Sequence, residues 1–325
     1  MIDLCPAMMS NSSIIVRREI MRKYFIISIL ILSVFVLNQS VSAQKLGFRF
    51  KLSGGYGNMG IGDPNALLDA SQSFLVNVGA FLEDIYTLPT EINGEVKKIS
   101  RSGAEFCGEA IITYGKFGLG LGLESLGSRS ATSRLVLNYV VSPESPINSQ
   151  IDGKFSILAL TANLYAFFGQ SPLEYYVFAG PGLFLGKATW DYLFQDDMVI
   201  FGGYFEDQSI NITSSGFGVQ GGLGIEYHFS PTLGFFAEGK ARFCKLKDWN
   251  GDESWETTLG GPFTWSGKLW YYEFYDWLYG TNEWYGYADI FETGNSPSGD
   301  YARNGRAFEV DLTGFSLRAG ICIRF

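Results

Sequence analysis

Apolar and polar residues alternate with a period of two along eight stretches of the chain. Successive side chains of a β-strand point to opposite faces, so this period predicts strands that each have one apolar and one polar face. Several stretches exceed the about five or six residues usual in globular sheets, and their length fits strands that cross a bilayer at a tilt. The stretches are residues 45–56, 102–114, 117–128, 153–168, 174–189, 213–229, 233–247 and 308–325.

The connections between these stretches alternate in length. The short connections are residues 115–116, 169–173 and 230–232. The long connections are residues 57–101, 129–152, 190–212 and 248–307. Barrels of the outer membrane have an even number of strands, short periplasmic turns and longer extracellular loops. We therefore predict an all-β fold for residues 44–325, namely an eight-stranded antiparallel up-and-down transmembrane β-barrel.

The last stretch shows the two faces most clearly. Its polar side carries Arg318 and Arg324. In a membrane barrel the apolar side faces lipid and the arginines face the lumen. The apolar side consists of Phe315, Leu317, Ala319, Ile321, Ile323 and Phe325.

Charged residues also recur on the predicted inward faces of the other strands. The interior of an eight-stranded barrel is just wide enough for side chains to fill. Because an isolated buried charge is costly, we expect a paired lumen charge network that plugs the barrel. In particular, Glu109 or Glu238 should meet a lysine or arginine across the lumen. The predicted members are Arg49, Lys51, Glu105, Glu109, Glu124, Glu226, Glu238, Lys240, Arg242, Arg318 and Arg324.

Residues 22–43 have the pattern of a secretory signal. A positively charged start precedes a short apolar run and a small-residue cleavage site that ends at Ala43. We predict that residues 1–43 are a signal region and are cleaved on export. Met21 looks like a normal start, so residues 1–20 are left out of the fold prediction. Export and a barrel together predict the outer membrane of a Gram-negative cell.

Composition narrows the class further. Aromatic residues make up 16% of the chain and charged residues 18%, and 40 residues are glycine, which favours many strands over helices. The net charge of −9 argues against a nucleic-acid partner, because phosphate recognition needs a basic surface. The four cysteines lack metal-type spacing, so we predict no metal and no other cofactor.

Taken together, these patterns resemble the small outer-membrane barrels of the OmpA and OmpW families. The resemblance covers the signal, the eight strands, a kink at residues 178–182 and the terminal residues 321–325. It implies outer-membrane lipid as the surroundings of the barrel. It also implies that Phe325 is part of the signal that the barrel-assembly machinery reads.

The fourth long connection is rich in tryptophan and tyrosine. These residues supply large, rigid contact area with a polar group, which suits recognition. They form either an extracellular binding surface for a glycan, a protein or a small apolar ligand, or a cap packed on itself or the outer interfacial belt. The candidates are Trp249, Trp255, Trp265, Trp270, Tyr272, Trp277, Trp284 and Tyr285. In the first long connection, residues 63–65 and the apolar spacing that follows predict a short amphipathic helix at the barrel mouth.

These features predict a non-enzymatic surface protein with a structural or binding role. The alternative is a passive channel for small solutes or small apolar molecules, which resembles OmpW and needs an open lumen or a lateral exit. A lipid-modifying enzyme is the third hypothesis. The single histidine, His228, lies beside the short turn at 230–232 and lacks a convincing Ser-Asp partnership. A soluble lipocalin-like binder would need an apolar lumen, whereas the more apolar faces here point outward.

Overall fold

The computed structural model describes residues 46–87, 89–139, 146–196, 203–275, 283–292 and 295–325. The predicted signal region and Trp277 lie outside these residues. Within the described part of the chain, no helix is both long and apolar enough to cross a membrane.

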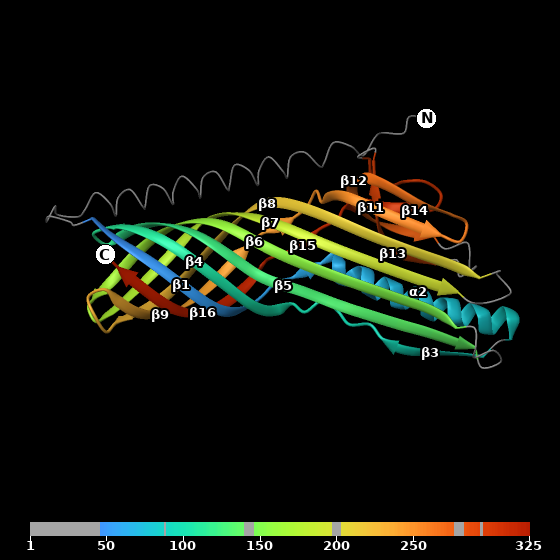
Figure 1. The fold of residues 1–325 in the computed structure, drawn as a ribbon, viewed down its shortest axis with the longest axis horizontal. Coiled ribbons are helices and arrows are strands. Elements are labelled where there is room, and N and C mark those ends of the chain that lie inside the picture. Colours follow the sequence, from blue (N-terminus) through green and yellow to red (C-terminus); the bar gives the residue numbers. More distant parts are fainter. Residues whose placement is uncertain (1–45, 88, 140–145, 197–202, 276–282, 293–294) are drawn as a thin grey trace, which may run out of the picture. The chain divides into compact units, whose positions relative to one another are not determined.

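Eight antiparallel strands close into a ring, in which each strand pairs with the next one along the chain and the last pairs with the first (Figure 1). The predicted eight-stranded up-and-down barrel is therefore confirmed. The ring strands are β1 (Leu46–Asn58), β4 (Ser102–Tyr114), β5 (Phe117–Tyr139), β6 (Ile147–Gln170), β7 (Leu173–Asp196), β8 (Tyr204–His228), β9 (Leu233–Phe243) and β16 (Gly314–Arg324).

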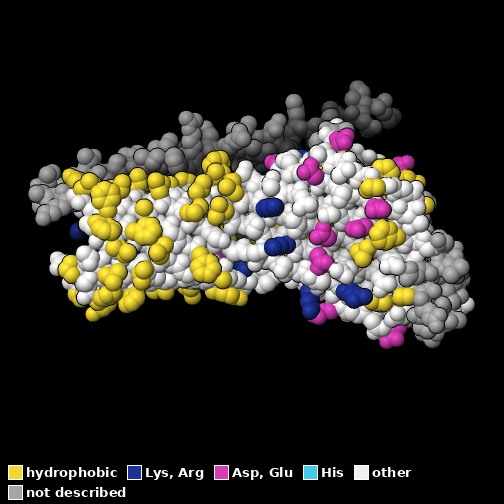
Figure 2. Space-filling model, viewed as in Figure 1, with side chains coloured by type: hydrophobic (Ala, Val, Ile, Leu, Met, Phe, Trp, Pro, Cys, Tyr) yellow, Lys and Arg dark blue, Asp and Glu magenta, His cyan; other side chains and the backbone are white. Residues whose placement is uncertain are grey.

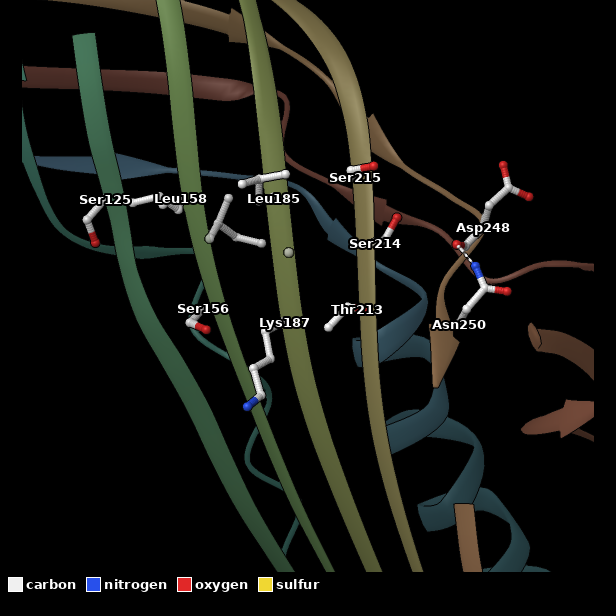
Figure 3. Close-up of a pocket in the computed structure, with 12 residues that line it drawn as sticks. Ser125, Ser156, Leu158, Leu185, Lys187, Thr213, Ser214, Ser215, Asp248 and Asn250 are labelled. Carbon is white, nitrogen blue, oxygen red and sulfur yellow. Dashed lines mark hydrogen bonds between the residues drawn. The ribbon is translucent and has the colours of Figure 1, made fainter. Parts of the chain in front are cut away.

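The outward faces of β5 to β8 change from apolar to polar at one level of the barrel. The last apolar and first polar outward residues are Leu123 and Ser125, Leu158 and Ser156, Leu185 and Lys187, and Phe217 and Ser215. Leu158, Leu185, Ser156 and Lys187 lie side by side along a shallow groove on this surface (Figure 3). Figure 2 shows hydrophobic side chains gathered over one end of the barrel and acidic side chains over the other half.

The height of the apolar band fits a membrane. On β8, outward apolar residues run from Phe217 to Tyr227. That length is about 33 Å along the strand, or about 25 Å along the axis at the usual tilt of about 40°, and about 25 Å is the height of the apolar band of outer-membrane barrels. Exposed aromatic residues gather near the short turns, as a girdle at the membrane interface would. They are Tyr114, Phe168, Tyr175, Tyr227, Phe229 and Phe325.

The predicted second and third loops, residues 129–152 and 190–212, are instead mostly strand. β5 to β8 continue beyond the apolar band as two long hairpins. The reason lies in the polarity of their faces: beyond the band the outward residues are polar and the inward ones apolar. Phe155 is buried, for example, whereas its neighbour Lys154 is exposed. The predicted strands therefore ended too early, because the alternation continues past the band with its two faces exchanged.

We call the part of the molecule beyond the apolar band its outer half. The first and fourth long connections build the rest of it. They contribute β3 (Thr90–Glu95), β11 (Asn250–Thr257), β12 (Gly260–Tyr275), β13 (Trp284–Phe291) and β14 (Ala302–Ala307). Beyond the apolar band the sheet therefore runs in the order β3-β5-β6-β7-β8-β11-β12-β13, and β14 pairs with β12. Three short strands, β2 (Ile61–Gly62), β10 (Lys245–Leu246) and β15 (Val310–Asp311), form a small separate sheet.

The predicted amphipathic helix is present as α2 (Asp63–Tyr86) and is longer than expected. Its buried face carries Leu68, Leu75, Val78 and Leu82 at helical spacing. Arg306 binds the Asp63 carboxylate at the first turn through both terminal nitrogens, at 2.5 and 2.6 Å. The helix contacts both β13 and β3, the two end strands of the outer sheet, and so joins the two edges of that sheet (Figure 1).

Candidate functional site

Two clusters of paired charges fill the interior of the barrel on the side of the short turns, which we call its lower half. The middle cluster contains Glu105, Glu124, Glu238, Lys240, Arg242 and Arg318, all of them buried. Lys240 binds Glu124, and Arg318 Nε donates to Glu238, which is its register neighbour on β9. Arg242 lies 3.3 Å from Glu105, and both arginines lie within 4 Å of Glu124, at 3.9 and 3.7 Å. These contacts give every carboxylate of the cluster a cationic partner.

The turn-side cluster lies at the end with the short turns. Arg49 and Arg324 both bind Glu174, at 3.0 and 2.5 Å. They also bind Glu226, at 3.4 and 3.2 Å. The remaining members are Lys51, 3.8 Å from Glu226, and His228, 3.0 Å from Glu226. Sequence reasoning missed Glu174, although it alternates in step with the inward residues Tyr176 and Phe178 of the same strand.

Glu109 differs from the other predicted members because its partners are neutral. Asn163 Nδ2 donates to it at 2.9 Å and the Tyr165 hydroxyl at 2.5 Å. A Cβ on the facing Gly120 would lie only 2.5 Å from Glu109 Oε1, so glycine makes room for this contact. We expected Glu109 or Glu238 to meet a cation across the lumen. Glu238 meets Arg318 on the adjacent strand, and Glu109 has Lys51 as its register neighbour on β1 but forms no ion pair with a described residue.

An apolar plug fills the barrel above the charge clusters. It combines inward residues of β6, β7 and β8 with the small sheet of β2, β10 and β15. Trp249, expected on a binding surface, is instead fully buried here at 0% exposure and packs edge-on against Phe155 at 6.2 Å. Its fully buried neighbours include Phe184, Leu246 and Leu312.

The outer half encloses a cavity of about 520 Å³, which we call the aromatic chamber. Such a volume is typical of small-molecule sites. Of its eighteen lining residues, ten are aromatic. These ten are Phe74, Trp190, Tyr192, Phe194, Tyr204, Trp255, Tyr272, Phe274, Tyr285 and Tyr287.

Helix α2 supplies one wall of the aromatic chamber. Asn77 Nδ2 donates to the Tyr285 hydroxyl at 2.8 Å, and the Phe74 ring meets the Tyr285 ring edge-on at 5.3 Å. Ser71 and Ala70 also line the cavity from the helix. The register of α2 against β13 therefore shapes the chamber.

A carboxyl group, Glu206 on β8, lies in the chamber wall. Trp255 Nε1 donates to Glu206 Oε1 at 2.9 Å, and the Tyr204 hydroxyl donates to Oε2 at 3.3 Å. Burial raises the pKa of the Glu206 carboxyl above its usual range, while these two hydrogen bonds oppose that rise. Glu206 is thus a fixed acceptor in a largely apolar wall.

Two further acids lie behind the lining. Gln208 Nε2, from the lining, donates to Glu253 Oε1 at 2.6 Å, and the Ile290 backbone N–H donates to Oε2 at 3.0 Å. Burial, together with a hydrogen bond to Glu253, raises the pKa of Asp289. The raised pKa favours the neutral form of Asp289, which reduces the charge that the fold must bury.

Trp249 lies in the apolar plug and Trp277 outside the described residues, and the other six predicted loop aromatics divide into two groups. Trp255, Tyr272 and Tyr285 line the chamber. The others lie outside the lining: Trp265 against Trp255, Trp270 beneath Lys268 and Trp284 beneath Arg303. The lining residues Trp190, Tyr192, Phe194 and Tyr204 were missed because they lie in the segment predicted as the third loop. Their alternation in the sequence could have revealed them.

No family model and no curated protein sequence matches the chain. Among solved structures, Neisserial surface protein A is 12% identical, with 86% of this chain and 97% of that chain covered and a TM-score of 0.30. Ail of Yersinia pestis, solved with the heparin analogue sucrose octasulfate, is 12% identical, with 86% and 99% covered and a TM-score of 0.28. The outer membrane protease OmpT of Escherichia coli is 10% identical, with 88% and 99% covered and a TM-score of 0.30.

These TM-scores are too low to carry a functional assignment. The class of the protein rests instead on its own strand pairing. A closed ring of eight antiparallel strands with an apolar outer band is the architecture of the small outer-membrane barrels.

Proposed function

We propose that the protein is an outer-membrane barrel that carries a small-molecule binding chamber outside the lipid. The observation that carries the proposal is the aromatic chamber, a cavity of about 520 Å³ with ten aromatic side chains in its wall. Sites for small molecules are concave, mostly apolar and fitted with a few placed polar groups. Glu206 and Gln208 are such groups here.

The position of the chamber supports a role at the cell surface. Its strand walls are the parts of β7 and β8 beyond the apolar band, together with β11, β12 and β13. The outward faces of β5 to β8 at this level are polar, as expected in water. The short turns lie at the other end, where outer-membrane barrels face the periplasm.

The packed interior favours binding over passive conduction. Side chains of the middle cluster are buried and paired, and the apolar plug lies above them. A water-filled path would need these layers to be displaced, at the cost of exposing buried apolar and charged groups. The volume of the chamber also suits a small molecule better than a protein partner.

The composition of the chamber wall favours binding over catalysis. Its lining contains Ser71 as the one aliphatic hydroxyl and no histidine. His228, the single histidine of the chain, belongs to the turn-side cluster at the other end of the barrel. A nucleophile with an adjacent base, the usual arrangement for hydrolysis, is not formed by these lining residues.

Two further partners belong to the proposal. Outer-membrane lipid would surround the apolar band, and the barrel-assembly machinery would read the last strand. Phe325, at the end of that strand, is 81% exposed, so its ring is accessible for such recognition.

Filling the chamber tests the proposal. Ser71 lines the cavity, whereas the neighbouring Gln72 is exposed on the same helix. Ser71→Trp should abolish quenching of tryptophan fluorescence by small aromatic and amphiphilic compounds, and Gln72→Trp should preserve it. The titrations are made in nanodiscs of uncharged lipid. If quenching in both variants equals that of the parent protein, the chamber is not the binding site.

A further inference from the structure

We infer that the aromatic chamber selects an organic cation, an ammonium group carried on an apolar body. This inference rests on the proposed binding function and names the chemical class of its ligand. It follows from how the acids of the chamber are partnered and from what surrounds them.

The acids of the chamber have neutral partners. Glu206 accepts from an indole and a phenol, and Glu253 accepts from an amide side chain and a backbone N–H. Among the described residues, no ion pair includes Glu206, Glu253 or Asp289. The chamber therefore has acidic character that this part of the chain does not neutralise.

The contrast with the lower barrel is informative. There, the buried Glu105, Glu124 and Glu238 each bind an arginine or lysine. A buried carboxylate without a cation is costly, and the fold avoids that cost in the middle cluster. In the chamber that cost applies to the charged form of Glu206, and a ligand that brings its own positive charge would remove it.

The aromatic wall adds a second attraction for cations. The faces of Trp and Tyr rings attract ammonium groups, and the effect is largest where water is excluded. Trp190, Tyr192 and Tyr204 come from β7 and β8, and Trp255 from the neighbouring β11. Aromatic rings from three strands thus line the same cavity as Glu206.

The geometry at Glu206 prepares it to receive a cation. Its two oxygens are held by different donors, Trp255 Nε1 and the Tyr204 hydroxyl, and both donors also line the cavity. A carboxylate accepts several hydrogen bonds, so both oxygens keep capacity for a ligand. An ammonium beside Glu206 would also stabilise its charged form.

Other ligand classes fit less well. An anion would meet Glu206 in the wall and Glu253 behind it. A sugar needs many donors and acceptors, but polar groups of the lining are already engaged: Tyr285 with Asn77 and Gln208 with Glu253. A neutral apolar molecule would leave the buried carboxyl groups without a cation.

Three probes with one tail and different head groups test the inference. They are hexyltrimethylammonium, hexyl glucoside and hexyl sulfate, each titrated against the full chain in uncharged nanodiscs while tryptophan fluorescence is recorded. We expect the cation to bind about tenfold more tightly than either of the others. Glu206→Gln should remove most of this preference, whereas Glu256→Gln, at an exposed position of β11, should leave it intact.

Tighter binding of the glucoside or of the sulfate, or equal binding of all three probes, refutes the cation inference and leaves a binding chamber in place. Binding of none of them, in protein that shows folded-state gel migration, counts against the proposed function as well. An unchanged cation preference in Glu206→Gln refutes the role given to that carboxylate.

Discussion

Trp255 donates its indole N–H to Glu206 at 2.9 Å, and both side chains line the same cavity. This contact joins β11, from the fourth long connection, to β8 of the barrel. It fixes the only carboxylate of the lining between aromatic rings. The first prediction concerns this hydrogen bond.

Trp255→Phe keeps an aromatic ring in the wall but removes the donor to Glu206. The lost donor no longer holds Glu206 in place or favours its charged form, so binding of hexyltrimethylammonium should weaken by about tenfold. Isothermal titration calorimetry measures the loss. Trp284→Phe is the matched control, because Trp284 lies beneath Arg303 outside the lining. Equal losses in both variants would show that the effect is not local to Glu206.

Cation binding should depend on pH through Glu206. Burial raises the pKa of this carboxyl, Asp289 adds to the rise, and the hydrogen bonds from Trp255 and Tyr204 oppose it. Below the raised pKa the carboxyl is neutral, so affinity should fall as the pH falls through it. Glu206→Gln should flatten the profile of fluorescence titrations. A profile that persists in Glu206→Gln would assign the dependence to another group.

The same pKa shifts affect the stability of the outer half. Because the pKa values of Glu206 and Asp289 are raised in the folded state, the folded chain holds protons more tightly than the unfolded chain. Stability from these groups is therefore greatest below the ordinary carboxyl range and is lost as the pH rises through the raised values. Hydrogen exchange of β11 and β13 should accelerate over that window. The rates are corrected for the pH dependence of intrinsic amide exchange. Exchange that then slows in this window would contradict the raised pKa values of Glu206 and Asp289.

Removing one partner of the middle cluster should be costly. Arg318→Met leaves Glu238 buried without its arginine, which costs about 3–5 kcal/mol. The double variant Arg318→Met with Glu238→Gln should recover part of this loss. Lys187→Met, at an exposed position, should change the unfolding free energy by less than about 0.5 kcal/mol. Urea titrations followed by heat-modifiable gel migration supply the values, and equal stability of the Arg318 and Lys187 variants would contradict the paired network.

The apolar plug should keep the barrel closed. We expect no steady conductance from the parent protein in planar bilayers. In urea titrations, Trp249→Ala, which removes a fully buried ring of the plug, should cost about 3–5 kcal/mol of unfolding free energy. Steady conductance of the parent protein would instead favour the passive channel.

The membrane-embedded part of the barrel was largely predictable from the sequence. Lipid requires apolar outward faces, so residues such as Leu121 and Phe217 impose a clear period of two. Beyond the band water requires polar outward faces, so the apolar residues turn inward. The continuing strands were therefore mistaken for loops. The chamber depends on β8 pairing with β11 across about forty residues of sequence, as at Ile210 and Glu253. No local pattern specifies such a pairing, so the cavity and the burial of Trp249 could not be foreseen.

The apolar band should lie in the outer membrane and the aromatic chamber outside it. Single cysteines at Thr258, Leu160 and Thr232, in a chain whose native cysteines are replaced by serine, test it on intact cells. A membrane-impermeant maleimide should label position 258 at once, position 232 after the outer membrane is permeabilised, and position 160 in neither case. Labelling of position 232 but not 258 on intact cells, or recovery of the chain in the soluble fraction, would contradict the account.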